Sequence, residues 1–331
     1  MTVHIRRREF IVTLGGAAAA LPLAVRAEQP TKMSVIACIV GGSMTAAERY
    51  FGGFSQGMRE LGYTQGRDYG FEIRYAEGEQ ERNPLLAEEL TRLKPDILVS
   101  GTLGGVIAFK RFTDSIPIVS PALIDPVGFG WAASHARPGG NVTGVLSTVE
   151  DLPGKQFALA AEMVPGVSRI GLLTNPGNPS HPLLRPGLEV AAKTLGIELT
   201  TLEARSPDEL HVAFQRFARD KTNIVFALTD AMFLNERKRI ALLAMAERLP
   251  TMFAFRENVE DGGVMSYGID WHASWRRLAG FVDRILKGTK AGDLPIEFPA
   301  KLALVINLTA AKILGLTIPS TLLARADEVV E

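Results

Sequence analysis

The sequence predicts an α/β protein made of two doubly wound parallel-sheet lobes that are joined by a hinge and face each other across a cleft. Short β-branched runs alternate with longer amphipathic runs, which is typical of parallel strands covered by helices on both faces. This alternation restarts near residue 152 and therefore indicates a second lobe of the same kind. The 331-residue chain, 47% of it hydrophobic, is long enough for two domains with cores of their own.

The first round of elements opens with a continuous apolar run at residues 33–40, as expected for a strand buried on both faces. A helix at residues 46–61 follows and ends at Gly62. The remaining elements of this round are helices at 83–93 and 103–112 and strands at 69–75, 96–100, 116–120 and 142–146.

The second round contains helices at 152–164, 183–195, 207–218, 235–248 and 271–287, and strands at 169–174, 197–202, 223–228, 251–255, 263–267 and 302–306. Ligands of doubly wound sheets bind beyond the carboxyl ends of the strands. We therefore expect binding residues in the loops that follow these strands, and a hinge that closes the cleft on a ligand.

The N-terminus predicts an export signal at residues 1–27, which is removed near Ala27. Arg6, Arg7 and Arg8 precede a short apolar stretch at 11–23 that is too short to span a bilayer. The order Arg7-Arg8-Glu9-Phe10-Ile11 fits a twin-arginine signal, and an ordinary export signal is the alternative. The single cysteine, Cys38, lies in an apolar run, so we expect neither a lipid anchor nor an internal disulfide.

The charge balance excludes nucleic acid as an expected partner. The chain has 36 basic and 36 acidic residues, and without the signal its net charge is about −3, with no basic cluster. We expect an exported, soluble periplasmic protein, and a monomer is the simplest state for a diffusing carrier.

Several segments together resemble the ABC transporter substrate-binding protein family, in an uncharacterised branch related to binders of amino acids, including aromatic ones. The resemblance covers nearly the whole chain and rests on residues 7–11, 57–63, 75–78, 125–127, 137–145, 284–288, 305–308 and 323–328. The sequence departs from the usual pattern at 101–105 and 121–124, both in predicted ligand loops, so the ligand is not carried over.

The resemblance implies the type I periplasmic fold, in which the chain crosses between the lobes three times. By analogy the crossings fall near 146–148, 255–261 and 287–299, so lobe one takes residues 30–147 and 256–290 and lobe two takes 148–255 and 291–331. It also implies a small-solute ligand, such as an amino acid or related carboxylate, and a permease of an ABC importer as partner. A periplasmic sensor that presents its ligand to a signalling receptor is the alternative.

The candidate ligand residues follow the predicted strands. Free N–H groups at the helix start after Ser100 favour a carboxylate, and the carboxylate of Asp230 could pair with an amine. The other candidates have structural alternatives: a helix cap, a turn, the hinge or the core. The full set is Gly42, Ser43, Ser100, Gly101, Thr102, Asp125, Asn175, Asp230, Glu257 and Tyr267.

The sequence gives little support to an enzyme. Residues 53–57 match the G-x-S-x-G motif of serine hydrolases around Ser55, which makes a serine hydrolase a further alternative, but they fall inside the predicted helix at 46–61 and not on a strand-to-helix turn. Two glycines lower the stability of a helix, so we expect them to allow close packing on the sheet. The five histidines are isolated, and neither a dinucleotide fingerprint nor a P-loop is present, so we expect no cofactor and no metal. The stripe Trp271, Trp275 and Leu278 has helical spacing and is interpreted as core.

Overall fold

The computed structural model describes residues 33–331, and the predicted export signal lies outside the described residues. The first group of elements comprises strands β1 (Ser34–Val40), β2 (Tyr69–Tyr75), β3 (Ile97–Ser100), β4 (Ile118–Leu123) and β5 (Val142–Leu146), and helices α1 (Met44–Glu60), α2 (Asn83–Arg92), α3 (Leu103–Lys110) and α10 (Trp271–Leu286). The second group comprises strands β6 (Arg169–Thr174), β7 (Glu198–Glu203), β8 (Ile224–Ala227), β9 (Thr251–Phe253), β10 (Met265–Ile269), β11 (Leu302–Asn307) and β12 (Glu328–Val330), and helices α4 (Leu152–Met163), α5 (His181–Leu195), α6 (Pro207–Arg219), α7 (Ala231–Asn235), α8 (Arg237–Ala246), α9 (Arg256–Glu260), α11 (Leu308–Ile313) and α12 (Ser320–Leu323).

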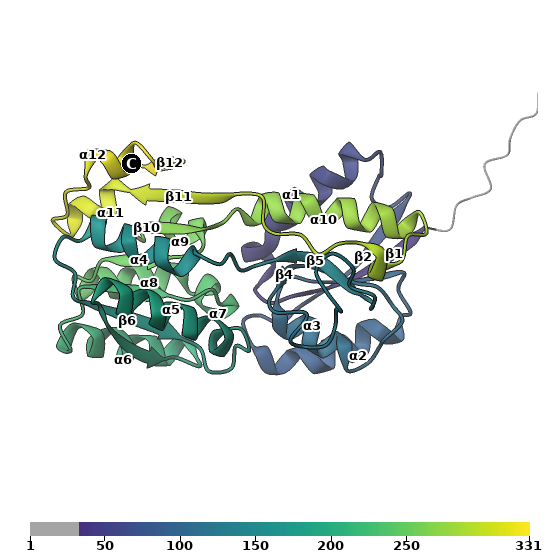
Figure 1. The fold of residues 1–331 in the computed structure, drawn as a ribbon, viewed down its shortest axis with the longest axis horizontal. Coiled ribbons are helices and arrows are strands. Elements are labelled where there is room, and N and C mark those ends of the chain that lie inside the picture. Colours follow the sequence, from purple (N-terminus) through teal and green to yellow (C-terminus); the bar gives the residue numbers. More distant parts are fainter. Residues whose placement is uncertain (1–32) are drawn as a thin grey trace, which may run out of the picture. The chain divides into compact units, whose positions relative to one another are not determined.

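The strands form two sheets, and helices cover both faces of each (Figure 1). The five-stranded sheet has the order β2-β1-β3-β4-β5 and is parallel throughout. The seven-stranded sheet has the order β12-β11-β10-β9-β8-β6-β7, with β10 and β11 antiparallel. We call the five-stranded sheet with its helices the first lobe and the seven-stranded sheet with its helices the second lobe.

Strand β1 shows why each sheet needs helices on both faces. Ile36 and Cys38 belong to a core formed with α1 and α10, whereas Ala37 and Ile39 belong to a core formed with α2 and α3. Successive side chains of a strand point to opposite faces, so a continuous apolar run requires cover on both sides. The Cys38 thiol is fully buried, and this burial raises its pKa.

The sheet pairing corrects one expected crossing between the lobes. Strand β10 pairs with β9 and β11 in the second lobe, although residues 256–269 were expected in the first. The chain enters the first lobe only after Ile269, where α10 begins and packs on α1, β4 and β5. The crossing at 255–261 rests on analogy with the family fold, whereas the short helix α9 packs on β9, β10 and β11 of the second lobe.

Two glycines of α1 allow it to pack closely on α10. A Cβ atom on Gly53 would lie 2.4 Å from the carbonyl oxygen of His272, and one on Gly57 would lie 2.5 Å from that of Arg276. These glycines belong to the G-x-S-x-G match, which lies in the middle of α1 as expected. They serve helix–helix packing, whereas the sequence suggested packing on the sheet.

Within residues 33–331, no helix has the length and apolar character needed to cross a membrane.

Candidate functional site

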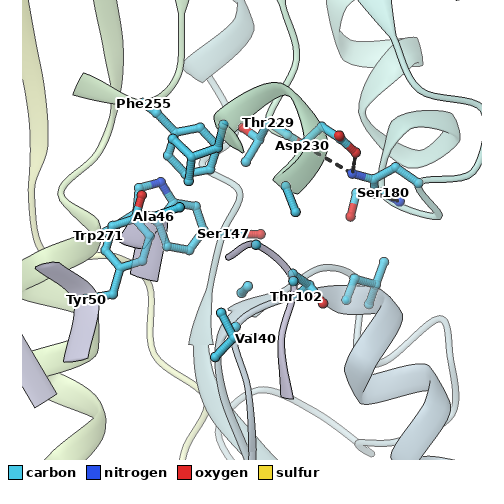
Figure 2. A pocket seen from close by; sticks show the side chains of 18 of the residues that line it. Val40, Ala46, Tyr50, Thr102, Ser147, Ser180, Thr229, Asp230, Phe255 and Trp271 are labelled. Atoms are coloured by element: carbon cyan, nitrogen blue, oxygen red, sulfur yellow. Dashed lines mark hydrogen bonds between the residues drawn. The ribbon is translucent and has the colours of Figure 1, made fainter. Parts of the chain in front are cut away.

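A cavity of about 100 Å³, here called the first cavity, lies where the carboxyl ends of strands from both lobes face each other (Figure 2). The first lobe contributes the loops after β1, β3, β4 and β5, and the second lobe contributes those after β6, β8 and β9. Parallel strands direct all their carboxyl ends to one edge of a sheet, so this position follows from the topology. Its lining residues are Val40, Gly41, Gly42, Ala46, Ala47, Tyr50, Gln80, Gly101, Thr102, Leu103, Ala122, Ile124, Ser147, Asn178, Ser180, Leu184, Thr229, Asp230, Ala231, Leu234, Phe255, Trp271 and Trp275.

Four of the predicted site residues line this cavity, namely Gly42, Gly101, Thr102 and Asp230. Gly101 allows a close approach, because a Cβ atom there would lie 2.9 Å from the Trp275 ring. Thr102 caps α3, and its hydroxyl accepts a hydrogen bond of 3.2 Å from the Gly105 N–H. Leu103 in the first turn of α3 also lines the cavity, and the N–H groups of a first helical turn have no partners inside the helix.

The carboxylate of Asp230 is buried and already accepts four hydrogen bonds. Oδ1 accepts from the N–H groups of Met232 at 2.8 Å and Phe233 at 3.2 Å, which caps α7. Oδ2 accepts from the side-chain amides of Asn178 at 2.8 Å and Asn175 at 3.3 Å. These amides and N–H groups carry no charge, so Asp230 brings its negative charge to the cavity wall.

Three other predicted residues shape the loops. Ser43 caps α1 through a 3.3 Å hydrogen bond from the Ala46 N–H. The fully buried Ser100 hydroxyl donates to the carbonyl of Thr102 at 2.8 Å. Asn175 is buried and, besides its bond to Asp230, accepts a 2.9 Å hydrogen bond from the Gly177 N–H.

The last three predicted residues lie outside the first cavity. Asp125 lines a second cavity, and its Oδ1 accepts a 2.9 Å hydrogen bond from the Gly128 N–H in an Asx-type turn. Tyr267 is half-buried against the core of the second lobe. Glu257 lies in α9, in a network of charged side chains between α1 and the second lobe. The structure thus does not bring these three together with the other seven.

The sequence did not predict the aromatic wall of the first cavity, which is formed by Tyr50, Phe255, Trp271 and Trp275. Figure 2 labels the first three of these residues. Trp271 and Trp275 do belong to the core of the first lobe, but they also reach the cavity. Phe255 follows β9, so the expectation that binding residues follow the strands, which identified Thr102, could also have identified Phe255. The two tryptophans carried no such signal, because their helical spacing is the same for core and cavity residues.

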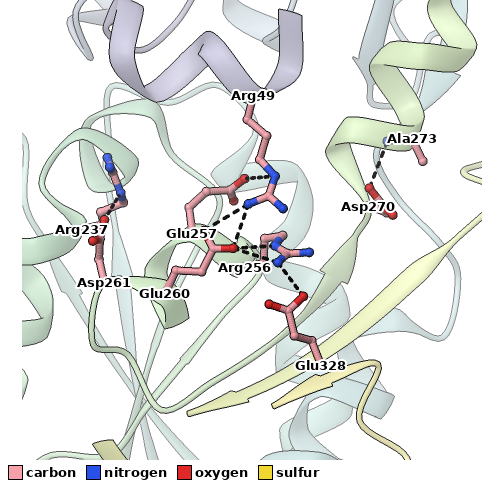
Figure 3. A network of polar contacts seen from close by, with 9 residues as sticks. All are labelled: Arg49, Arg237, Arg256, Glu257, Glu260, Asp261, Asp270, Ala273 and Glu328. Atoms are coloured by element: carbon pink, nitrogen blue, oxygen red, sulfur yellow. Dashed lines mark hydrogen bonds and ion pairs between the residues drawn. The ribbon is translucent and has the colours of Figure 1, made fainter. Parts of the chain in front are cut away.

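The charged network joins the lobes beside the cavity (Figure 3). The Arg49 guanidinium of α1 donates to both carboxylate oxygens of Glu260 in α9, at 2.8 and 3.1 Å, and its Nε lies 3.9 Å from Glu257. Arg256 also donates to Glu260, at 2.8 Å, and to Glu328, at 2.6 Å. The network is thus continuous from α1 to β12.

Glu257 and Tyr50 are the most buried members of this region. Burial raises the pKa of the Glu257 carboxyl, although Arg49 opposes the shift. Burial, followed by the negative charge of Glu257, raises the pKa of the Tyr50 phenol well above its ordinary value. The Tyr50 hydroxyl and Glu257 Oε2 form no hydrogen bond with any residue that the structure describes.

A model of the family described as ABC transporter substrate binding protein matches residues 32–330. The chain belongs to this family. Its members are substrate-binding proteins and not enzymes, which removes the hydrolase interpretation of Ser55. The fold is that of the type I periplasmic binding proteins, with two lobes.

Two solved structures and a curated relative are similar to the chain over most of its length. A conserved domain protein from Vibrio cholerae is 30% identical, with a TM-score of 0.84 over 90% of this chain and 100% of that one. A domain from Streptococcus pneumoniae in complex with L-Trp is 23% identical, with a TM-score of 0.83 and the same shares. The Tyrosine-binding protein of Clostridioides difficile is 22% identical over 80% of this chain and 76% of its own.

Proposed function

We propose that this chain captures an amino acid with an aromatic or large apolar side chain outside the cytoplasm and delivers it, with its lobes closed, to the permease of an ABC importer. The observation that carries the proposal is the first cavity, which both lobes enclose and which combines an aromatic wall with a single carboxylate.

The charge of the lining favours a zwitterion. Asp230 is the only Asp, Glu, Lys, Arg or His among the described residues that line the first cavity. A ligand with a net negative charge would be repelled, whereas an ammonium group gains from the negative charge. The ligand carboxylate would bind the first-turn N–H groups of α3, at the positive end of the helix dipole. An α-amino acid presents both groups on one carbon atom.

The aromatic wall favours a large apolar side chain. Phe255 and Trp271 pack with ring centroids 5.7 Å apart, and Tyr50 and Trp275 complete this side of the cavity. Burying an aromatic side chain against such a surface contributes about 2 to 3 kcal/mol. The relatives that bind L-Trp and tyrosine support an amino acid of this class.

Contacts between the lobes support closure. The N–H of Ser43 donates to Oδ1 of Asn235 in α7 at 3.0 Å, and Arg49 binds Glu260 of α9. Each contact joins α1 or its cap to the second lobe, so opening the cleft would break both. A ligand that touches both lobes stabilises the closed form by its differential affinity for that form.

The decisive experiment measures binding to the chain from residue 28 onward by calorimetry and thermal unfolding. The panel contains L-tyrosine, L-tryptophan, L-phenylalanine, L-leucine, L-glutamate and glucose. At a hundredfold excess over its Kd, a ligand stabilises the folded chain by about 2.7 kcal/mol, which raises Tm by several degrees. We expect shifts with the aromatic amino acids and none with glutamate or glucose. Binding of glutamate or glucose alone would contradict the proposal.

Two matched variants separate binding from folding. Phe255 lines the first cavity only, so Phe255→Ala should raise the Kd of an aromatic ligand at least tenfold, which is a loss of about 1.4 kcal/mol in binding free energy. Phe298 is 62% exposed and lies outside the first cavity, so Phe298→Ala should leave the affinity unchanged.

Loss of uptake of the bound amino acid in cells lacking this chain would support an importer, whereas unchanged uptake would favour the sensor alternative. N-terminal sequencing should find Glu28 at the start of the exported protein.

A further inference from the structure

A larger cavity adjoins the first one and shares part of its lining. This second cavity has a volume of about 480 Å³, compared with about 100 Å³ for the first. The two cavities share the side chains of Ile124, Ser147, Leu184, Thr229 and Trp271. These five residues lie at the boundary between the two cavities and are here called the partition, and the cavity beyond them is larger than the first.

Trp271 is the largest residue of the partition and is held firmly in place. It is the first residue of α10, directly after Asp270, whose Oδ1 caps the helix by accepting from the Ala273 N–H at 3.0 Å (Figure 3). Its ring packs against Phe255, with the Tyr50 ring on the same side of the cavity (Figure 2). Only 9% of the residue is exposed.

The indole N–H of Trp271 forms no hydrogen bond with any residue that the structure describes. A tryptophan retained for its N–H would have a partner, because buried donors are nearly always paired. In this structure the ring acts as an apolar surface. Replacing it with a smaller side chain therefore removes no hydrogen bond to a protein acceptor.

We propose that Trp271 sets the length of the ligand side chain, by closing the first cavity at the partition and excluding ligands that would extend into the second cavity. This inference rests on the proposed function, because it takes the first cavity as the amino-acid site. With the ligand's charged groups held at α3 and Asp230, its side chain points to the aromatic wall and ends at Trp271.

The second cavity fits the continuation of an apolar side chain. Leu188, Phe226 and Leu228 provide buried apolar surface there. Its charged lining residues are Asp125 and Glu150, with His135 beside them and neither Lys nor Arg among the described residues. A variant that lacks the Trp271 ring should therefore bind amino acids with long aromatic side chains, and it should still reject amino acids with anionic side chains.

The test compares L-phenylalanine with biphenylalanine, in which a second phenyl ring replaces the para hydrogen. Calorimetry measures both on the wild type, Trp271→Ala and Trp271→Phe. We expect the wild type to favour phenylalanine at least tenfold, and Trp271→Ala to reduce this preference at least tenfold. Trp271→Phe keeps most of the partition and should keep the preference.

A second change shows whether the gained space is the second cavity. Gly187 lines only that cavity, and a Cβ atom there would meet only Pro153, at 3.4 Å. Adding Gly187→Leu to Trp271→Ala should restore the preference for phenylalanine. Gly154→Leu is the matched control, because Gly154 is an exposed residue of the neighbouring helix α4 with nothing within 4 Å, and it should restore nothing.

The outcomes separate this inference from the proposed function. If the wild type binds neither phenylalanine nor any other amino acid of the panel, the proposed function fails and the inference fails with it. Equal wild-type affinity for both ligands, or an unchanged preference in Trp271→Ala, overturns the length limit while leaving amino-acid binding intact. Thermal unfolding checks that Trp271→Ala folds, and Trp271→Leu replaces it if it does not.

Discussion

Glu257 and Glu260 lie one turn apart in α9 and experience opposite environments. Burial raises the pKa of Glu257, and Arg49, at 3.9 Å, compensates only weakly. Glu260 is also partly buried, but hydrogen bonds from Arg49 and Arg256 outweigh that burial and lower its pKa. The same arginine therefore favours one ionised carboxyl strongly and the other little, because only Glu260 receives its paired N–H groups.

These opposite shifts predict opposite effects of pH in two matched variants. Folded Glu257 holds its proton to a higher pH than the unfolded chain does, so its contribution to stability falls as pH rises above the ordinary value of 4.5. Glu257→Gln removes this loss and should raise the free energy of unfolding more at pH 7 than at pH 5. Urea unfolding at the two pH values measures the difference.

Glu260→Gln should do the reverse. The lowered pKa of Glu260 contributes stability above its ordinary value of 4.5, and that stability is lost as pH falls through the folded value. The variant should be less stable than the wild type at pH 7 and approach it in acid. Equal pH profiles for the two variants would show that burial and the Arg49 contact do not control these carboxyls.

Individual residues also show what the sequence could predict about the site. The position of Thr102 and Asp230 in the cavity lining was predictable, because each follows a recognisable strand and carries a polar side chain. Asp125 follows a strand in the same way, but its loop takes it to the second cavity. Trp271 was not predictable, because its spacing shows only that its face of α10 is buried. Which buried residue touches a cavity depends on the packing of both lobes.

At the scale of elements, the contact between α1 and α10 holds together segments that are far apart in the sequence. Gly53 and Gly57 let the α1 backbone approach α10 closely, and Phe54 and Met58 fill the adjoining core. Glycine lowers helix stability by about 1 kcal/mol relative to alanine, and the close packing of α1 on α10 offsets this loss. The helix itself was predictable from its period, but its partner was not.

Alanine substitutions along α1 should therefore have opposite signs. In Gly57→Ala, the new Cβ atom would lie 2.5 Å from the carbonyl of Arg276 and 2.7 Å from Ala279 Cβ, so we expect a loss of about 1 to 3 kcal/mol. Gly52 is exposed with nothing within 4 Å, so Gly52→Ala should gain about 0.5 to 1 kcal/mol. Urea unfolding measures both. A stabilising Gly57→Ala would contradict the close contact.

Across the whole molecule, alternation of strands and helices predicted both sheets, because each buried strand has a distinct apolar run. Short elements such as α7, α9, α11 and β12 were missed, since a single turn or three residues shows no period. The antiparallel β10–β11 pair was missed as well, because strand direction depends on the path of the chain through α10 and back. Glu257 is affected by the same limit, because the expected crossing at 255–261 is the helix α9 of the second lobe.

Closure of the two lobes should depend weakly on Arg49. Its side chain is 38% exposed, and such ion pairs contribute about 0.2 to 1 kcal/mol. Arg49→Met should therefore raise the ligand Kd by a factor of about 1.4 to 5 at low salt and by less at high salt. The control is Arg92→Met, because Arg92 pairs with Glu88 within α2 and not between lobes, so its Kd should stay unchanged. Equal effects of both variants would exclude a role for Arg49 in closure.

The buried thiol of Cys38 has a practical consequence for the study of this motion. A thiol with a raised pKa and no exposed surface reacts slowly with maleimides, so the native chain should take up almost no dye. Cysteines introduced at two exposed positions, such as Leu85 in the first lobe and Val212 in the second, could then be labelled without removing Cys38. Energy transfer between the two dyes would follow opening and closing of single molecules in real time, on an otherwise unaltered protein.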